Sequence, residues 1–235
     1  YIAAGTGDIK LALDLLKSGE IPGDPIPVYL ETCKILYGQS DYRGLDAVTA
    51  FGLRELAGND SLDARRGRGI LLDYSGLAGA SEGDYTRAEA SFSASIALLM
   101  PSDPGGNGVQ IPLAGPRSLA LMHLGQMYAL IGQKSKALAQ IPLGLAAAAE
   151  AEEDAGKSPD SVAFLPEALF NQGSILLDCG RTEEALKSLD RAATLFQGRD
   201  MRLEMLKCEH SRGNALLRLG RTNEAIKALR SSLGR

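Results

Sequence analysis

Two near-copies of one pattern, forty residues apart, constrain the fold of this chain more than any other feature of its 235 residues. The first copy lies at 167–196 and the second at 206–233. Each has a glycine, two leucines three and four positions later, the triplet Gly-Arg-Thr, and then Glu-Ala before an apolar run. Repetition at this period predicts stacked supersecondary units, in which each unit buries its apolar face against its neighbours.

The apolar spacing within each copy predicts two amphipathic helices joined by a tight turn. Spacings of three, four and seven residues place the apolar side chains of the first copy on one face of each helix. These are Ala168, Leu169, Leu176, Leu177, Ala185, Leu186, Leu189, Ala192 and Phe196. We expect Gly180 to end the first helix in a left-handed conformation and Thr182 to cap the second. A mid-helix glycine costs about 1 kcal/mol relative to Ala, so Gly173 is expected to permit close packing against the helix that carries Ala185.

This pattern resembles the tetratricopeptide repeat. The family's small and large positions are matched by Leu169, Gly173, Leu176, Gly180, Ala185, Leu189 and Ala192 and again by Gly213, Leu216, Gly220, Ala225, Leu229 and Ser232. Two further matches surround Gly125 and Gly76. The glycines at 76, 125, 173 and 213 are 49, 48 and 40 residues apart, whereas the usual period is about 34. The long period resembles the variety found in kinesin light chains, cell-polarity adaptors and bacterial peptide-pheromone receptors.

The resemblance implies an all-α fold, a right-handed superhelical solenoid of antiparallel helix pairs that forms a single domain over residues 1–235. We expect the helix pairs at about 1–19 (partial), 26–58, 61–100, 117–154, 162–197 and 200–234. Residues 101–116 are rich in Gly and Pro and are expected to form a loop.

Composition narrows the classes of function. With 25 basic and 29 acidic residues the net charge is −4, which argues against a dedicated nucleic-acid binder. Residues 200–235 hold 8 Lys/Arg and 4 Asp/Glu, hence +4, which leaves −8 for the rest. No stretch approaches the roughly 18 apolar residues of a membrane span, so we expect no membrane insertion.

The cysteines and the N-terminus predict the compartment. Cys33, Cys179 and Cys208 are odd in number and far apart in helical segments, which favours buried thiols in a reducing, cytoplasmic compartment. The chain begins at Tyr1 with neither Met nor a signal pattern. We therefore expect it to belong to a larger chain or complex.

Catalytic and metal-binding patterns are weak. Residues 79–83 match Gly-x-Ser-x-Gly around Ser81, but that motif acts as a strand-to-helix turn with a histidine in reach, and here it joins two helices. One residue separates Cys208 from His210, and on a helix this spacing points their side chains away from each other. We therefore predict no enzymatic activity, no metal site and no cofactor.

The tetratricopeptide resemblance implies partner-binding residues on the concave wall lined by the first helix of each pair. At the family's groove positions the chain has Met122, His123, Gln126, Phe170, Asn171, Ser174, Lys207, His210, Ser211 and Asn214, with Leu119 and Glu167 beside them. Amide and imidazole groups can hydrogen-bond an extended peptide backbone. Some members of the family bind the C-terminal carboxylate of heat-shock chaperones through five side chains, and only Asn171 and Lys207 match two of these five positions. A carboxylate needs several converging cations, so the match is too incomplete to predict such a site.

These observations predict a non-catalytic scaffold that binds a protein, as a peptide or a partner helix, in the concave groove. One alternative is a ligand- or peptide-sensing regulatory domain of a larger signalling protein. Another is a structural subunit of a complex that binds through its convex face or its ends.

Overall fold

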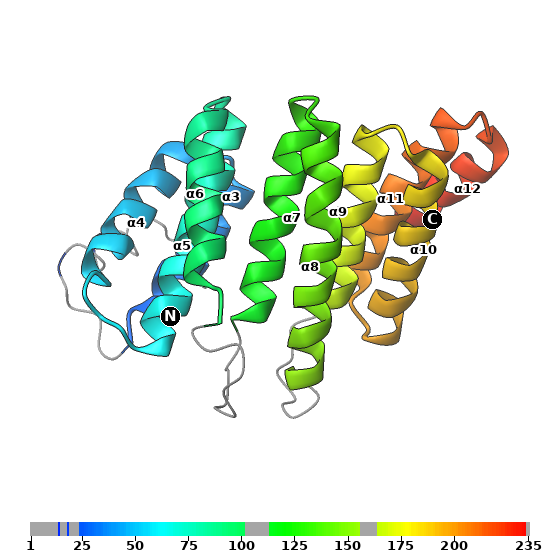
Figure 1. Ribbon diagram of the computed structural model, residues 1–235. Coiled ribbons are helices and arrows are strands. Elements are labelled where there is room, and N and C mark those ends of the chain that lie inside the picture. The colour runs from blue at the N-terminus through cyan, green and yellow to red at the C-terminus, as the bar shows by residue number, and fades with distance from the viewer. Residues whose placement is uncertain (1–13, 15–17, 19–23, 102–112, 156–163, 234–235) are drawn as a thin grey trace. The chain divides into compact units, whose positions relative to one another are not determined.

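The computed structural model describes residues 14, 18, 24–101, 113–155 and 164–233. Within these residues the chain forms ten α-helices and no strands, which confirms the all-α class (Figure 1). The partial repeat expected at 1–19 lies almost entirely outside the described residues. The chain divides into two compact units, Tyr1–Ala120 and Leu121–Arg235.

The first unit contains two helix pairs. Its helices are α3 (Ile26–Gly38), α4 (Tyr42–Glu55), α5 (Leu62–Glu82) and α6 (Tyr85–Leu98). The side chains of Asp41, Ser61 and Asp84 each accept a hydrogen bond from a backbone N–H in the first turn of α4, α5 and α6. Such caps satisfy amide groups that have no partner within the helix, so short polar residues in the sequence set where these helices begin.

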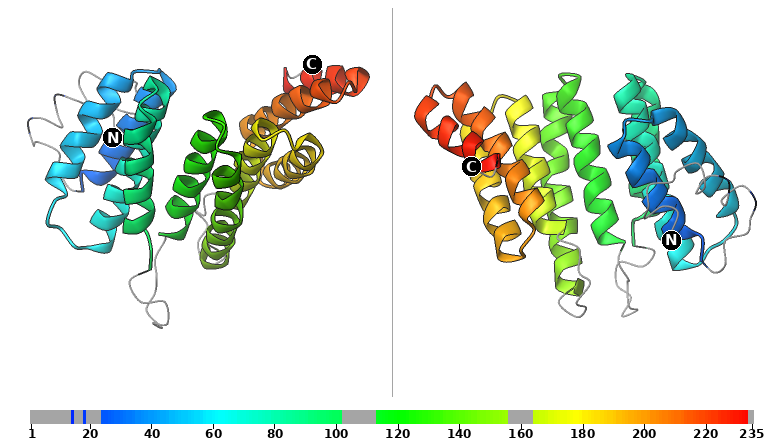
Figure 2. Two further views of the ribbon diagram at one scale, coloured as in Figure 1. Left: turned by 45° about the horizontal axis from the view of Figure 1, so that its top comes forward. Right: turned by 180° about the vertical axis from the view of Figure 1, so that it is seen from behind.

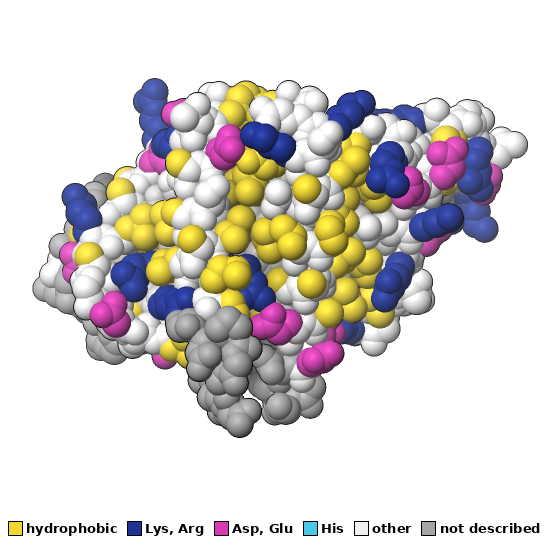
Figure 3. Space-filling view, in the orientation of Figure 1, with side chains coloured by type: hydrophobic (Ala, Val, Ile, Leu, Met, Phe, Trp, Pro, Cys, Tyr) yellow, Lys and Arg dark blue, Asp and Glu magenta, His cyan; other side chains and the backbone are white. Residues whose placement is uncertain are grey.

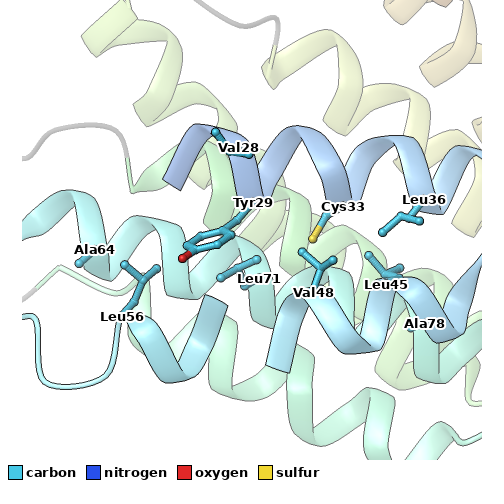
Figure 4. Packing of buried hydrophobic residues seen from close by; sticks show 10 residues of the cluster. All are labelled: Val28, Tyr29, Cys33, Leu36, Leu45, Val48, Leu56, Ala64, Leu71 and Ala78. Carbon is cyan, nitrogen blue, oxygen red and sulfur yellow. The ribbon is translucent and has the colours of Figure 1, made fainter. Parts of the chain in front are cut away.

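One apolar cluster holds α3, α4 and α5 together (Figure 4). Tyr29 of α3 lies beside Leu71 of α5, Leu36 of α3 lies opposite Leu45 of α4, and all four side chains are buried. The other members of the cluster are Val28, Cys33, Val48, Leu56, Ala64 and Ala78. Burying one large apolar side chain stabilises the fold by roughly 1.5–3 kcal/mol. Because α3, α4 and α5 all contribute side chains to the cluster, this stabilisation requires the three helices to pack together.

The second unit continues the helix pairs. It comprises α7 (Ala114–Leu130, the start of which belongs to the first unit), α8 (Lys134–Ala155), α9 (Phe164–Asp178), α10 (Thr182–Gly198), α11 (Arg202–Arg218) and α12 (Thr222–Ser232). The helix α7 begins at Ala114, so the loop expected at 101–116 ends earlier than we predicted. Pro116 lies in the first turn of α7, where a missing backbone N–H costs nothing, and its neighbours Leu113 and Ala114 are buried.

The repeated glycines do what the sequence predicts of them. A Cβ atom on Gly173 would lie 2.7 Å from Cγ of Leu189, and one on Gly213 would lie 2.5 Å from Cγ of Leu229. Each glycine therefore lets the two helices of its pair approach closely. Gly180 has φ +83° and Gly220 has φ +72°, which is the left-handed turn expected between the helices.

The expected cap at Thr182 is wrong. The residue at the start of α10 is Arg181, which makes no side-chain capping bond, while Thr182 is already helical and buried. The Arg181 carbonyl accepts the first helical hydrogen bond from the N–H of Ala185. The Arg181 guanidinium instead pairs with Glu184 in two hydrogen bonds of 2.6 Å, so an ion pair takes the place of a polar cap.

Candidate functional site

The predicted binding residues lie on the first helices of three successive pairs in the second unit. Helix α7 carries Met122, His123 and Gln126, helix α9 carries the 170–174 set, and helix α11 carries the 207–214 set. Helices α9 and α11 contact each other and run side by side in Figure 2. Their candidate residues occupy the same repeat positions, so they share one face of the unit.

One hydrogen bond joins the candidate residues of α7 and α9. The Gln126 side-chain amide donates to Oδ1 of Asn171 over 3.1 Å. Gln126 is half-buried, whereas Asn171 is only 6% exposed. A buried amide needs a partner, so this bond sets the orientation of the Asn171 side chain and leaves the outer part of Gln126 at the surface.

Polar groups continue along the face on α9 and α11. The Ser174 hydroxyl donates to the Phe170 carbonyl, one turn earlier in α9, over 3.4 Å. On α11 the Asn214 amide and the His210 imidazole are 3.3 Å apart, and both side chains are exposed. Lys207 is exposed and Ser211 is half-buried. The face therefore offers amide, hydroxyl and imidazole groups at successive turns, which suits hydrogen bonding to a peptide backbone.

Two of the predicted contact residues are buried or half-buried and are not fully accessible on this face. Met122 is completely buried, because its side chain fills the space above Gly144 of α8, where a Cβ would lie 2.8 Å from the Met122 methyl carbon. We correct its assignment from partner-binding to core. Phe170 is half-buried because it packs against the cluster of Leu169, Ala192, Phe196 and Cys208 between α9, α10 and α11. Its exposed edge is the apolar element that remains on the face.

The structure also contains an open cavity that the sequence did not predict. It measures about 430 Å³ and lies between α8, α9 and α10. Its lining combines Leu138, Ile141 and Pro142 of α8 with Arg181 and Lys187 from the start of α10. Pro142 lacks an N–H, so it cannot donate to the Leu138 carbonyl in the wall of this cavity. Pro142 was notable in the sequence only as a proline inside a helical pattern.

Three side chains that could act as nucleophiles, those of Cys33, Cys208 and Ser81, are placed unfavourably for such chemistry. Burial raises the pKa of Cys33 and of Cys208 to about 12, so both thiols are protonated near neutral pH and are poor nucleophiles. Ser81 lies in the last turn of α5 and not on a strand-to-helix turn. Cys208 is buried whereas His210 is exposed, so these two side chains point apart as expected.

No helix in the described part of the chain is both long and apolar enough to cross a membrane. In the second unit, hydrophobic side chains gather over α8, while Lys and Arg side chains are frequent over α10 and α12 (Figure 3). The basic side chains over α12 agree with the excess of basic residues at 200–235.

Comparison with known proteins relates this arrangement to one family. The family model described as tetratricopeptide repeat matches residues 166–197, which are the α9–α10 pair. No curated protein matches the sequence.

Among the solved structures that share the fold are a Rap protein, BtubC and a kinesin-light-chain-type protein. A Rap protein in complex with competence and sporulation factor has a TM-score of 0.69 at 14% identity, covering 94% of this chain and 57% of the Rap chain. BtubC (BKLC) from P. vanneervenii has a TM-score of 0.61 at 12% identity, covering 98% and 87%. A kinesin-light-chain-type protein of P. anserina with nearly identical TPR-like repeats has a TM-score of 0.54 at 14% identity, covering 97% and 92%. This chain therefore spans little more than half the length of the Rap chain.

Proposed function

Since this chain is a helical repeat protein of the tetratricopeptide type, we propose that it is a non-catalytic interaction scaffold. Its partner is a protein, bound as an extended peptide or a helix on the face formed by α7, α9 and α11 in the second unit. Repeat solenoids present extended surfaces for such partners. The fold alone does not define the role, so the proposal rests on the side chains of that face.

The hydrogen bond between Gln126 and Asn171 is the observation that carries the proposal. It links two neighbouring first helices through amide groups, and the same row continues with Ser174 on α9 and with His210 and Asn214 on α11. A backbone that passes along this row meets donors and acceptors at each helix. The half-buried Phe170 supplies an apolar contact beside them. A Rap protein with this fold was solved in complex with competence and sporulation factor, which supports a binding role for the fold.

The test is affinity capture from a lysate of the source cells, with partners identified by mass spectrometry. The variant Gln126→Ala/Asn214→Ala removes one amide from each end of the row. Asn171 is left intact because it is buried and its loss would disturb packing. The matched control, Gln140→Ala/Gln197→Ala, removes two amides from the second helices α8 and α10.

We expect the wild type and the control to capture the same partner and the Gln126/Asn214 variant to lose it. Because Gln126→Ala also removes the donor of the buried Asn171, capture is carried out below the melting transition of this variant, where the circular dichroism of all three proteins is equal. Equal capture by all three proteins would refute binding on this face. Loss in the control alone would move the binding surface to the second helices.

A further inference from the structure

The open cavity between α8, α9 and α10 has a counterpart in the next repeat, where an ion pair occupies the same place. The repeat offset is 48 residues from the α7–α8 pair to the α9–α10 pair and 40 residues from there to the α11–α12 pair. These offsets place Pro142 of α8 at the position of Asp190 in α10, and Gln172 of α9 at the position of Arg212 in α11. The helices α10, α11 and α12 therefore provide an internal reference for the cavity.

In this reference, two charged side chains span the space between neighbouring helices. The Arg212 guanidinium lies 2.7 Å from a carboxylate oxygen of Asp190, so the pair links α11 to α10. Proline and glutamine cannot form such a pair. The side chains of Pro142 and Gln172 instead line a cavity of about 430 Å³. Two residue differences between the repeats thus replace a bridging ion pair by an open space.

Much of the cavity wall is apolar. Ile141 of α8 and Leu176 of α9 are buried, and Leu138 of α8 is half-buried. The cavity volume falls within the range of about 300–1,000 Å³ that small-molecule sites occupy. Such sites are mostly apolar and carry a few polar groups that orient the ligand. The cavity therefore suits a small molecule with an aliphatic part.

The polar part of the lining carries one cation in excess. Arg181 is neutralised by Glu184 through two hydrogen bonds of 2.6 Å. Lys187, one turn later in α10, is exposed and makes no ion pair with any residue that the structure describes. The half-buried Gln172 amide likewise makes no hydrogen bond within the described residues. An ammonium group and an amide in the lining therefore remain available to a ligand.

These two groups favour a carboxylate. The Lys187 ammonium can form a charge-assisted hydrogen bond with one carboxylate oxygen, and the Gln172 amide can donate to the other. A ligand that carries an aliphatic chain beside its carboxylate also covers the apolar wall, and removing apolar surface from water is favourable. Charge complementarity and the apolar lining thus indicate the same class of ligand.

We propose that this cavity binds a small aliphatic monocarboxylate. The carboxylate lies against Lys187 and Gln172, and the aliphatic chain lies on Ile141 and Leu176. The site is separate from the face proposed for the protein partner. Gln172 and Phe170 are two residues apart on α9, and at 3.6 residues per turn this spacing points them to opposite sides of the helix.

Octanoate is the probe, and octanamide, which has the same chain without the charge, is its matched control. Each is titrated into the 235-residue protein under reducing conditions, with binding followed by amide shifts in two-dimensional NMR spectra. The variant Lys187→Met removes the charge and keeps an unbranched side chain. Lys227→Met makes the same change at the corresponding position of α12. Both lysines are exposed, so neither variant disturbs the core.

A second variant closes the cavity with the ion pair of the next repeat. Pro142→Asp/Gln172→Arg reproduces the residues of the Asp190–Arg212 pair. It also restores a backbone N–H inside α8, where proline removes one, so its melting temperature should be at least that of the wild type. Loss of binding in this variant therefore reports on the cavity and not on unfolding.

We expect octanoate to bind the wild type and Lys227→Met equally, and to bind Lys187→Met about tenfold more weakly, as suits one charge-assisted hydrogen bond. The double variant should not bind it. Absence of octanoate binding, equal affinity for octanoate and octanamide, or unchanged binding by the double variant would overturn the proposal. Tighter, Lys187-dependent binding of the peptide acetyl-Ala-Ala-Ala-Leu would also overturn it, because the cavity would then take a protein C-terminus.

Discussion

Replacing Gly173 by Ala tests the close packing of α9 on α10. In the interior of a helix, Ala is favoured over Gly by about 1 kcal/mol, so on local grounds alone the substitution stabilises the protein. The new Cβ would lie 2.7 Å from both Cγ and Cδ2 of Leu189. Leu189 is completely buried, and its Cγ is a branch point that moves only with the whole side chain. Overpacking of this kind costs about 1–3 kcal/mol.

The steric cost therefore exceeds the propensity gain, and we expect Gly173→Ala to lower the free energy of unfolding by about 1 kcal/mol. For a chain of this size the melting temperature should fall by about 2–4 °C. Urea denaturation followed by circular dichroism at 222 nm measures the free energy directly.

Gly198→Ala is the matched control, because Gly198 lies at the end of α10, the helix on which Gly173 packs, and a Cβ there would meet nothing within 4 Å. It should leave stability unchanged or raise it slightly. If Gly173→Ala stabilises the protein as much as Gly198→Ala does, the glycine is not needed for close approach and the packing argument is wrong.

Three further outcomes follow from the described contacts. Gln126→Ala should cost about 1–3 kcal/mol because it leaves the buried Asn171 oxygen without its donor, and a double-mutant cycle with Asn171→Ala in urea denaturation should show non-additivity. Glu152 accepts hydrogen bonds from Arg199, at 2.9 Å, and from the Leu165 N–H, and the Arg199 guanidinium lowers the pKa of this carboxyl. A lowered folded-state pKa means that the contribution of Glu152 to stability is complete above its ordinary pKa of 4.5 and is lost as pH falls through the folded value; Glu152→Gln should thus lower stability by about 1 kcal/mol at pH 7 and by less at pH 3, and an equal loss at both pH values would contradict this. The thiols of Cys33 and Cys208, buried and with pKa values of about 12, should react with a thiol reagent at pH 8 only after unfolding. Rapid reaction of either thiol in the native protein would show that the helix carrying it opens readily.

Much of the local structure could be predicted from the sequence, because its determinants are local. The apolar spacing around Leu169 and Leu189 specifies two amphipathic helices, and Gly180 and Gly220 specify the turns that follow α9 and α11. Even the close approach at Gly173 is predictable, since a mid-helix glycine needs a packing reason. The register of the repeat also places the candidate residues on the first helices.

The tertiary structure decided what is exposed. Met122 and His123 are neighbours at predicted groove positions, yet Met122 is buried because Gly144, on another helix, leaves room for its side chain. Thr182 resembles a cap, but the ion pair of Arg181 with Glu184 takes that place. Leu186 and Ile226 occupy the same position in near-identical repeats, and α11 covers the first while the second remains exposed. The exposed fraction of such a side chain depends on whether a neighbouring helix covers it. The sequence of a single repeat does not contain that information.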